Sequence, residues 1–168
     1  MVKQLLLPLA GVAAFIILVG LLVKNSGNIN IPGLPTPAPA SLETKTIKVD
    51  NTLVNVEVAN TESSREKGLG GRNSLAENSG MLFVFDSKGV TVGFWMKDML
   101  IPLDMIWISE GKVVKIDKNI PAPAAGIPDD KLTVYNPGQP VDYVLEVNAG
   151  FSDKNNIKVG DSVDLSSI

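Results

Sequence analysis

The sequence predicts a mainly β fold: a compact β-sandwich or barrel with one or two short helices, preceded by a single transmembrane helix and a Pro-rich linker. Three observations lead to this prediction. Short apolar or alternating stretches follow one another between closely spaced turn residues. After the N-terminal part, only short stretches carry the start and stop signals of a helix. An apolar run lies near the N-terminus, and a proline-dense segment follows it.

The N-terminal run, residues 5–23, contains no charged or strongly polar side chain. At about 1.5 Å per residue it reaches roughly 28 Å, close to the hydrocarbon thickness of a bilayer. We therefore predict a transmembrane signal anchor over residues 1–24, which contacts the membrane through residues 5–23. A cleaved signal peptide is the alternative, because Ala38-Pro39-Ala40 has the small-x-small pattern of a cleavage site.

Residues 25–43 are rich in Pro, Gly and Asn and predict an extended linker. A β-rich soluble domain is then expected over residues 44–168. Lys3 and the terminal amine precede the apolar run, and Lys24 follows it. By the positive-inside rule, this favours a single-pass protein of the cell membrane whose soluble domain is extracytoplasmic.

Composition excludes several classes of function. Cysteine and histidine are both absent, so disulfides, thiol nucleophiles, imidazole bases and Cys/His zinc sites are ruled out. We expect no cofactor and no bound metal, because no acidic spacing matches a known Ca²⁺ loop. The net charge is -3 and Lys and Arg form no cluster, so no nucleic-acid partner is expected.

The soluble domain begins with a predicted β-hairpin and a short helix. Residues 45–50 and 53–58 alternate polar and apolar side chains around a turn. Residues 61–70 are the clearest helix candidate, with Ser63 and Glu66 in the spacing of a capping box and glycines at the end.

The rest of the domain alternates strands and turns. Pro102 cannot donate a ladder hydrogen bond, so residues 99–103 are expected to turn or bulge. One or two helical turns are expected within residues 149–156. Strands are expected at residues 81–85, 90–97, 105–109, 112–116, 132–135, 141–147 and 162–165.

Several segments together resemble one family. They are Arg65 with Gly68-Leu69 and Arg72, GMLFVF at residues 80–85, FWMKD at 94–98, IPLDM at 101–105, YVLEVNAG at 143–150 and VGD at 159–161. In this order they resemble the domain of unknown function 192 family over residues 47–165. The resemblance implies a compact β-rich fold, often secreted or membrane-tethered in prokaryotes, and no established activity.

The chain departs from the family pattern at four positions. Asp98 and Met99 stand where the family usually has Asn and Thr, and Ser64 and Gly70 stand where it usually has Glu and Met. A site at residues 98 and 99 would therefore hold a carboxylate in place of an amide and would lack a hydroxyl.

Three charged residues within the apolar stretch 94–108 are candidate site residues: Lys97, Asp98 and Asp104. A charge in such a stretch is either paired in the interior or displayed at a site. In the functional interpretation, Lys97 or Asp98 ends a strand at the mouth of a cleft, beside Asp104 after the Pro102 bend. In the structural interpretation, Asp104 accepts backbone N–H bonds and Lys97 pairs with a carboxylate.

Two arginines and a tryptophan complete the candidate ligand-binding set. Arg65 and Arg72 flank the glycine-rich segment and would either clamp an anionic group or tie a helix to the sheet through salt bridges, for example to Asp104 or Glu146. Trp95 would serve either as a stacking platform or as part of the core.

The predicted function is a membrane-anchored extracytoplasmic module that binds a small ligand, an envelope polymer or an envelope protein partner. Arg65, Arg72, Trp95, Lys97, Asp98 and Asp104 are its predicted surface; no catalytic residue is assigned. A hydrolase that uses Asp, Glu or Lys is the alternative, with Asp98 and Asp104, or either of them with Glu146, as its carboxylate pair. A purely structural interaction module is a third interpretation.

Overall fold

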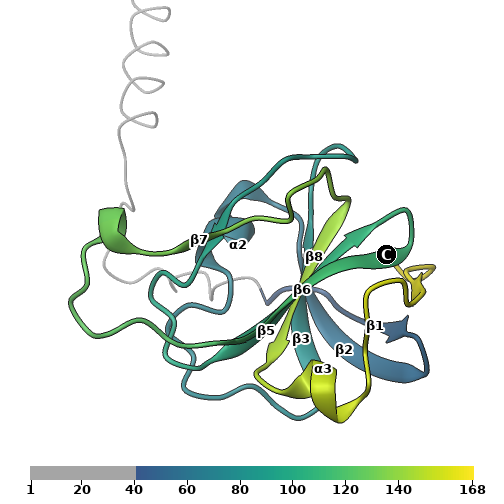
Figure 1. The fold of residues 1–168 in the computed structure, drawn as a ribbon, viewed down its shortest axis with the longest axis horizontal. Helices are drawn as coiled ribbons and strands as arrows, with labels where there is room; N and C mark the ends of the chain where they lie inside the picture. Colours follow the sequence, from purple (N-terminus) through teal and green to yellow (C-terminus); the bar gives the residue numbers. More distant parts are fainter. Residues whose placement is uncertain (1–40) are drawn as a thin grey trace, which may run out of the picture. The chain divides into compact units, whose positions relative to one another are not determined.

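The structure, a computed structural model, describes residues 41–168, and the predicted anchor and most of the predicted linker lie outside the described residues. One strongly curved β-sheet dominates the described part (Figure 1). Between residues 41 and 168, no helix is long and apolar enough to cross a membrane.

Seven strands form the main sheet. Their bounds are Thr44–Val49 (β1), Thr52–Ala59 (β2), Ser79–Val84 (β3), Leu103–Ser109 (β5), Lys112–Ile120 (β6), Tyr143–Asn148 (β8) and Val163–Asp164 (β9). The order across the sheet is β6-β5-β8-β3-β2-β1-β9. Neighbours are antiparallel except β2 and β3, which run parallel.

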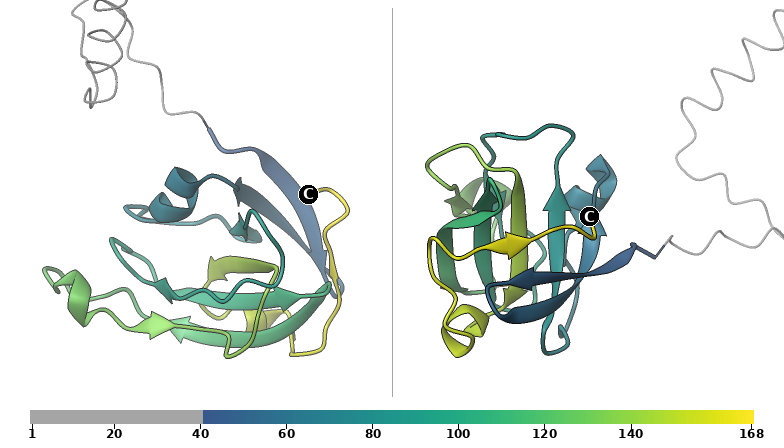
Figure 2. Two further views of the ribbon diagram at one scale, coloured as in Figure 1. Left: turned by 90° about the horizontal axis from the view of Figure 1, so that it is seen from above. Right: turned by 90° about the vertical axis from the view of Figure 1, so that its right-hand side faces the viewer.

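The two ends of the sheet approach each other, so the sheet is a nearly closed barrel (Figure 2). Val113 of β6 donates its N–H to the Asp161 carbonyl at 2.9 Å and accepts from Gly160 at 2.8 Å. Val163 of β9 donates to the Gly111 carbonyl at 2.8 Å. The expectation of a mainly β fold is confirmed, and of the two predicted architectures the barrel describes it.

The sheet packs apolar side chains on both of its faces, because successive residues of a strand point to opposite sides. The inner core lies within the curve of the barrel and draws on all seven strands. It includes Ile47, Val56, Leu82, Ile106, Val113, Leu145 and Val163. The outer core lies on the opposite face of the central strands. It includes Leu69, Met81, Phe83, Met96, Met99, Met105, Trp107 and Val144.

Short elements cover the outer core. They are α2 (Glu62–Lys67), a separate two-stranded sheet of β4 (Phe94–Trp95) and β7 (Val134–Tyr135), and the loops around them. The remaining short helices are η1 (Asp129–Lys131) and α3 (Phe151–Lys154). These covering elements matter for function because they form part of the wall of a cavity.

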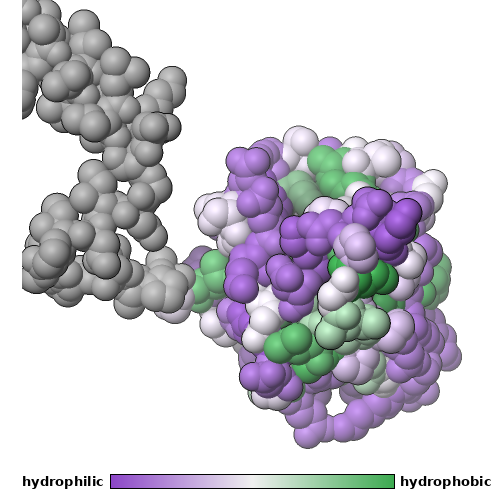
Figure 3. All heavy atoms as spheres, turned by 90° about the vertical axis from the view of Figure 1, so that its left-hand side faces the viewer, coloured by the Kyte–Doolittle hydropathy of each residue, from purple (hydrophilic) through white to green (hydrophobic). Residues whose placement is uncertain are grey.

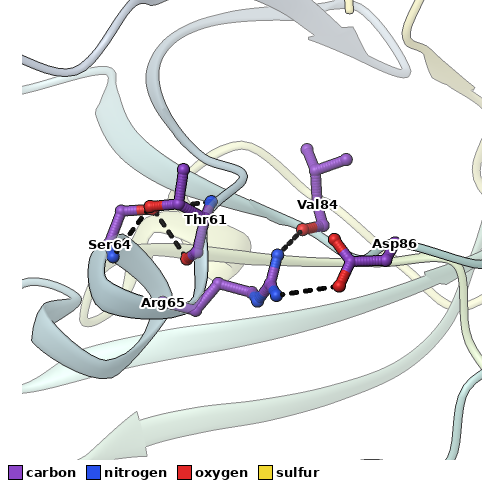
Figure 4. Close-up of polar contacts among 5 residues, drawn as sticks. All are labelled: Thr61, Ser64, Arg65, Val84 and Asp86. Carbon is purple, nitrogen blue, oxygen red and sulfur yellow. Dashed lines mark hydrogen bonds and ion pairs between the residues drawn. The ribbon is translucent and has the colours of Figure 1, made fainter. Parts of the chain in front are cut away.

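The predicted helix is present, but it begins at a different cap. Thr61 is the N-cap: its hydroxyl accepts the Ser64 N–H at 3.2 Å, and the Ser64 hydroxyl accepts the Thr61 N–H at 2.9 Å (Figure 4). The expected box at Ser63 and Glu66 was therefore wrong by two residues at its start. Ser satisfies the second half of the box as well as Glu does, because its hydroxyl also accepts a backbone N–H.

The strand expected at residues 90–97 is largely absent. Only Phe94–Trp95 pair as β4, and Val90 forms one isolated bridge to Val141. This stretch leaves the main sheet after β3 to cover the outer core, so it has no long neighbouring strand to pair with. The other predicted strands are present with boundaries shifted by a few residues.

Candidate functional site

Strand β8 carries a carboxyl group onto the outer face of the barrel. Glu146 lies in register with Met81 of β3 on one side and Met105 of β5 on the other. The residue is 4% exposed. No hydrogen bond or ion pair within residues 41–168 satisfies its carboxyl. Burial away from water raises the pKa of Glu146 to about 8, because the charged form loses hydration without gaining a partner.

Glu146 lines a cavity of about 380 Å³ that opens between α2 and β4. The rest of the lining comes from α2 with the turn after it, from the end of β3 and its following loop, and from β4 with its flanks. Its apolar members are Leu69, Phe83, Phe85, Val92, Phe94, Trp95 and Met99. This size lies within the range of a few hundred Å³ typical of small-molecule sites.

Aromatic rings form much of the cavity wall. Phe94 is at the centre of a cluster of edge-to-face contacts, with ring centroids 4.8 Å from Phe83, 6.4 Å from Phe85 and 5.6 Å from Trp107. Trp95, its neighbour in sequence, is 47% exposed. The rings of Phe83, Phe85, Phe94 and Trp95 are therefore available to whatever occupies the cavity.

The mouth of the cavity carries charges of both signs. Two of its cationic side chains, Arg65 and Lys97, already contact other residues of the protein. Arg65 donates to the Val84 carbonyl at 2.9 Å and approaches Asp86 at 3.4 Å (Figure 4). Lys97 pairs with Asp129 at 2.5 Å, and this contact raises the pKa of Lys97.

Two carboxylates of α2, Glu62 and Glu66, also line the cavity. Within residues 41–168 they form no ion pair. On the side of the molecule drawn in Figure 3, apolar patches lie among the polar surface.

The chain matches the family model DUF192, described as "Uncharacterized ACR", over residues 45–165. The chain belongs to the DUF192 family. The match spans the barrel and every residue of the cavity. No curated protein matches this DUF192 chain.

Two solved structures resemble this DUF192 protein. One is a Sinorhizobium meliloti protein provisionally described as a transcription regulator, at 29% identity and a TM-score of 0.68, with 78% of this chain and 100% of that chain covered. The other is a protein of unknown function from Novosphingobium aromaticivorans, at 28% identity and a TM-score of 0.66, with 79% and 94% covered.

Three of the six predicted site residues meet at the cavity of this DUF192 domain: Arg65, Trp95 and Lys97. The Lys97 ammonium lies 5.6 Å from the centre of the Trp95 ring, a cation–π distance. Asp98 does not line this cavity. It lies in a turn with φ of 57°, and its carbonyl accepts the Gly71 N–H at 2.8 Å.

Arg72 lies away from the cavity and pairs with Glu57 of β2. Its two terminal nitrogens reach the two carboxylate oxygens at 2.5 and 2.7 Å. The hydrogen bonds from Arg72 lower the pKa of Glu57. The two arginines therefore do not clamp a common ligand in this structure; each ties a loop or helix to a strand.

Asp104 lies on the inner side of β5 and is fully buried. Its carboxylate accepts three backbone N–H groups, from Asn119 at 2.8 Å, Gly150 at 3.1 Å and Ser152 at 2.8 Å. These bonds join β5 to the end of β6 and to α3. Lys97 and Asp104 are not partners, and Asp104 does not reach the cavity.

Glu146 was not in the predicted ligand-binding set; the sequence suggested it only as a salt-bridge partner and for the hydrolase alternative. The sequence carries a signal for it, since a Glu stands between Leu145 and Val147 in an apolar strand. Alternation alone permits that side chain to face water, and only the cover over the outer core buries it. Within residues 41–168, no three acidic side chains are close enough together to hold a metal ion.

Proposed function

We propose that this DUF192 protein is a membrane-anchored, extracytoplasmic binding module, and that a small ligand, or one group of an envelope polymer, enters the cavity over Glu146. The single observation that carries the proposal is the buried carboxyl of Glu146 at a cavity with aromatic walls. Burying an ionisable group without a partner costs stability, and such a cost is characteristic of a functional site.

The cavity wall supports binding in preference to a purely structural role. The cavity opens to solvent, and its volume of about 380 Å³ leaves room for a small molecule. Its wall keeps Trp95 47% exposed beside buried Phe83. Aromatic and aliphatic side chains around the Glu146 carboxyl, with charged residues at the mouth, are an arrangement that can orient a small ligand.

The hydrolase alternative finds less support in the geometry. General acid–base hydrolysis by carboxylates needs two of them facing the same bond. Of the carboxylates that line the cavity, Glu146 comes from the main sheet, and Glu62 and Glu66 come from α2. The raised pKa of Glu146 suits a general acid, but burial alone raises it and neither Glu62 nor Glu66 contributes to the shift.

A fragment screen by NMR tests the proposal. Residues 41–168 form a compact unit, and a solved relative consists entirely of the matching domain, so this part suits study alone. Bound fragments should shift backbone amide signals around Gly93, Phe94 and Trp95. Val92→Trp should abolish these shifts by filling the cavity, whereas Val159→Trp, at a position 64% exposed and away from the cavity lining, should preserve them. Shifts that scatter over the surface and survive Val92→Trp would contradict the proposal.

The anchor and its orientation need a separate experiment. Alkaline phosphatase fused after Ile168 is active only when it is exported. We expect activity in the membrane fraction, and deletion of residues 5–23 should abolish both the activity and the membrane association. An inactive fusion that remains in the membrane would place the domain on the cytoplasmic side.

A further inference from the structure

We propose that the cavity binds an organic cation, a protonated amine or a quaternary ammonium group, with the Glu146 carboxylate as its counter-ion and the surrounding aromatic rings as its wall. This inference rests on the proposed function, because it names the ligand class of the same site. Three features support it: the Glu146 carboxyl without a partner, the cluster of aromatic rings and the charged residues at the mouth of the cavity.

The strands beside Glu146 offer its carboxyl no hydrogen-bond donor. Its neighbours in register, Met81 and Met105, have thioether side chains that donate no hydrogen bond. The wall residues Leu69, Phe83 and Met99 offer no donor either. An ionised carboxylate accepts hydrogen bonds and attracts positive charge, so a cationic ligand would give Glu146 the partner that it lacks.

Aromatic rings form much of the wall of the cavity. Aromatic faces are negative and attract ammonium groups, most strongly when both are shielded from water. Phe83 and Phe85 each stand nearly perpendicular to Phe94, at 86° and 88°. Trp95 already holds a cation near its ring, the ammonium of Lys97 at 5.6 Å. Rings beside a carboxyl group are the arrangement that recognises ammonium ligands.

An anionic ligand does not suit the charges that line the cavity. An anionic ligand would need free cations at the base of the cavity, and the base carries a carboxyl group instead. At the mouth, Arg65 is engaged by Val84 and Asp86, and Lys97 by Asp129. The third cation of the lining, Lys67, comes from the same helix as the carboxylates of Glu62 and Glu66. An ionised Glu146 would also repel an anion bound beside it.

Binding is linked to a proton. The charged groups around the cavity are Glu62, Arg65, Glu66 and Lys67 from α2 and Lys97 from the segment after β4, while β3 contributes none. Because the pKa of free Glu146 is about 8, a quaternary ammonium ligand must displace its proton at lower pH. The affinity should therefore rise about tenfold per pH unit up to about pH 8 and then level off.

A matched set of probes tests the ligand class on residues 41–168. Choline and dimethylbutylamine are cations, while dimethylbutanol and dimethylbutanoate present a similar branched carbon skeleton as a neutral molecule and an anion. By NMR titration at about pH 8.5, at least one cation should bind at least tenfold more tightly than the alcohol and the acid. Glu146→Gln should remove this preference, whereas Glu43→Gln, a charge removal at an exposed position, should leave it unchanged.

Trp95→Ala supplies a second variant, because the side chain is 47% exposed and its removal should leave the fold intact. It should weaken cation binding severalfold and alcohol binding less. If the alcohol or the acid binds as tightly as the cations, the ligand class is wrong while the binding site stands. If no probe binds at millimolar concentration, the proposed ligand class is overturned, and the fragment screen separately decides whether the site binds any ligand.

Discussion

Glu146 of β8 lies in register with Met105 of β5, so a carboxyl group stands beside a thioether on the outer face of the barrel. Met81 of β3 flanks it on the other side. Neither neighbour donates a hydrogen bond or carries a charge, and this explains the raised pKa of Glu146. The barrel therefore holds an ionisable group at a position where an apolar residue would serve the fold better.

Glu146→Gln should flatten the pH dependence of stability. The pKa of Glu146 is about 8 in the folded protein and 4.5 in the reference state, so the folded state holds more protons between these values. Wild-type stability should fall as pH rises through this window, by at most about 4 to 5 kcal/mol. Urea unfolding of both proteins at about pH 5 and about pH 8.5 measures the difference. Parallel pH profiles would show that Glu146 is hydrated or paired in solution.

Asp104→Ala should cost about 3 to 5 kcal/mol of unfolding free energy, because three buried N–H groups lose a charged acceptor. Asp104→Asn keeps one acceptor oxygen and should cost less. Chemical denaturation at neutral pH measures both. Asp153→Asn is the control, since its carboxylate on α3 is 62% exposed and should matter little. If the Asp104→Ala variant were as stable as wild type, the carboxylate of Asp104 would not be needed for the fold.

The Arg72–Glu57 pair should contribute about 1 kcal/mol, discounted because both side chains are roughly a third exposed. A double-mutant cycle with Arg72→Met and Glu57→Gln measures the coupling. Since the pKa of Glu57 is lowered in the folded state, this contribution should be present at neutral pH and lost as pH falls below about 4.5. A coupling near zero at pH 7 would mean that the bidentate contact does not persist.

Lys97→Met should leave the unfolding midpoint unchanged within error. The Lys97–Asp129 pair is exposed on both sides, 41% and 55%, and water screens it. Thermal and urea unfolding measure the effect beside wild type. A large loss of stability would show that Lys97 supports the β4 segment through more than this one contact.

Much of the fold follows from local sequence patterns. Both hairpins were predictable. Residues 45–58 alternate around a turn, residues 105–116 combine an apolar run, the turn dipeptide Glu110-Gly111 and an alternating run, and a short turn fixes which strands pair. The parallel pairing of β2 with β3 was not predictable, because it depends on how α2 and the following loop return the chain. The closure of the barrel through β9 likewise rests on long-range contacts.

The site was less predictable than the fold. Trp95 and Lys97 were identifiable because a bulky ring and a charge interrupt an apolar stretch. The same signal marked Asp104, yet its backbone contacts come from segments distant in sequence. Glu146 could not be placed, because its burial depends on the cover formed by α2 and β4.

The central claim is that Glu146 is a protonated, buried carboxyl group at the base of a ligand site. Carbon-13 NMR of its side-chain carboxyl across a pH titration tests this most directly. We predict an apparent pKa near 8 in the free domain, lowered when choline or dimethylbutylamine is added. An apparent pKa near 4.5, unchanged by either cation, would contradict both the burial of the Glu146 carboxyl and the ligand class inferred from it.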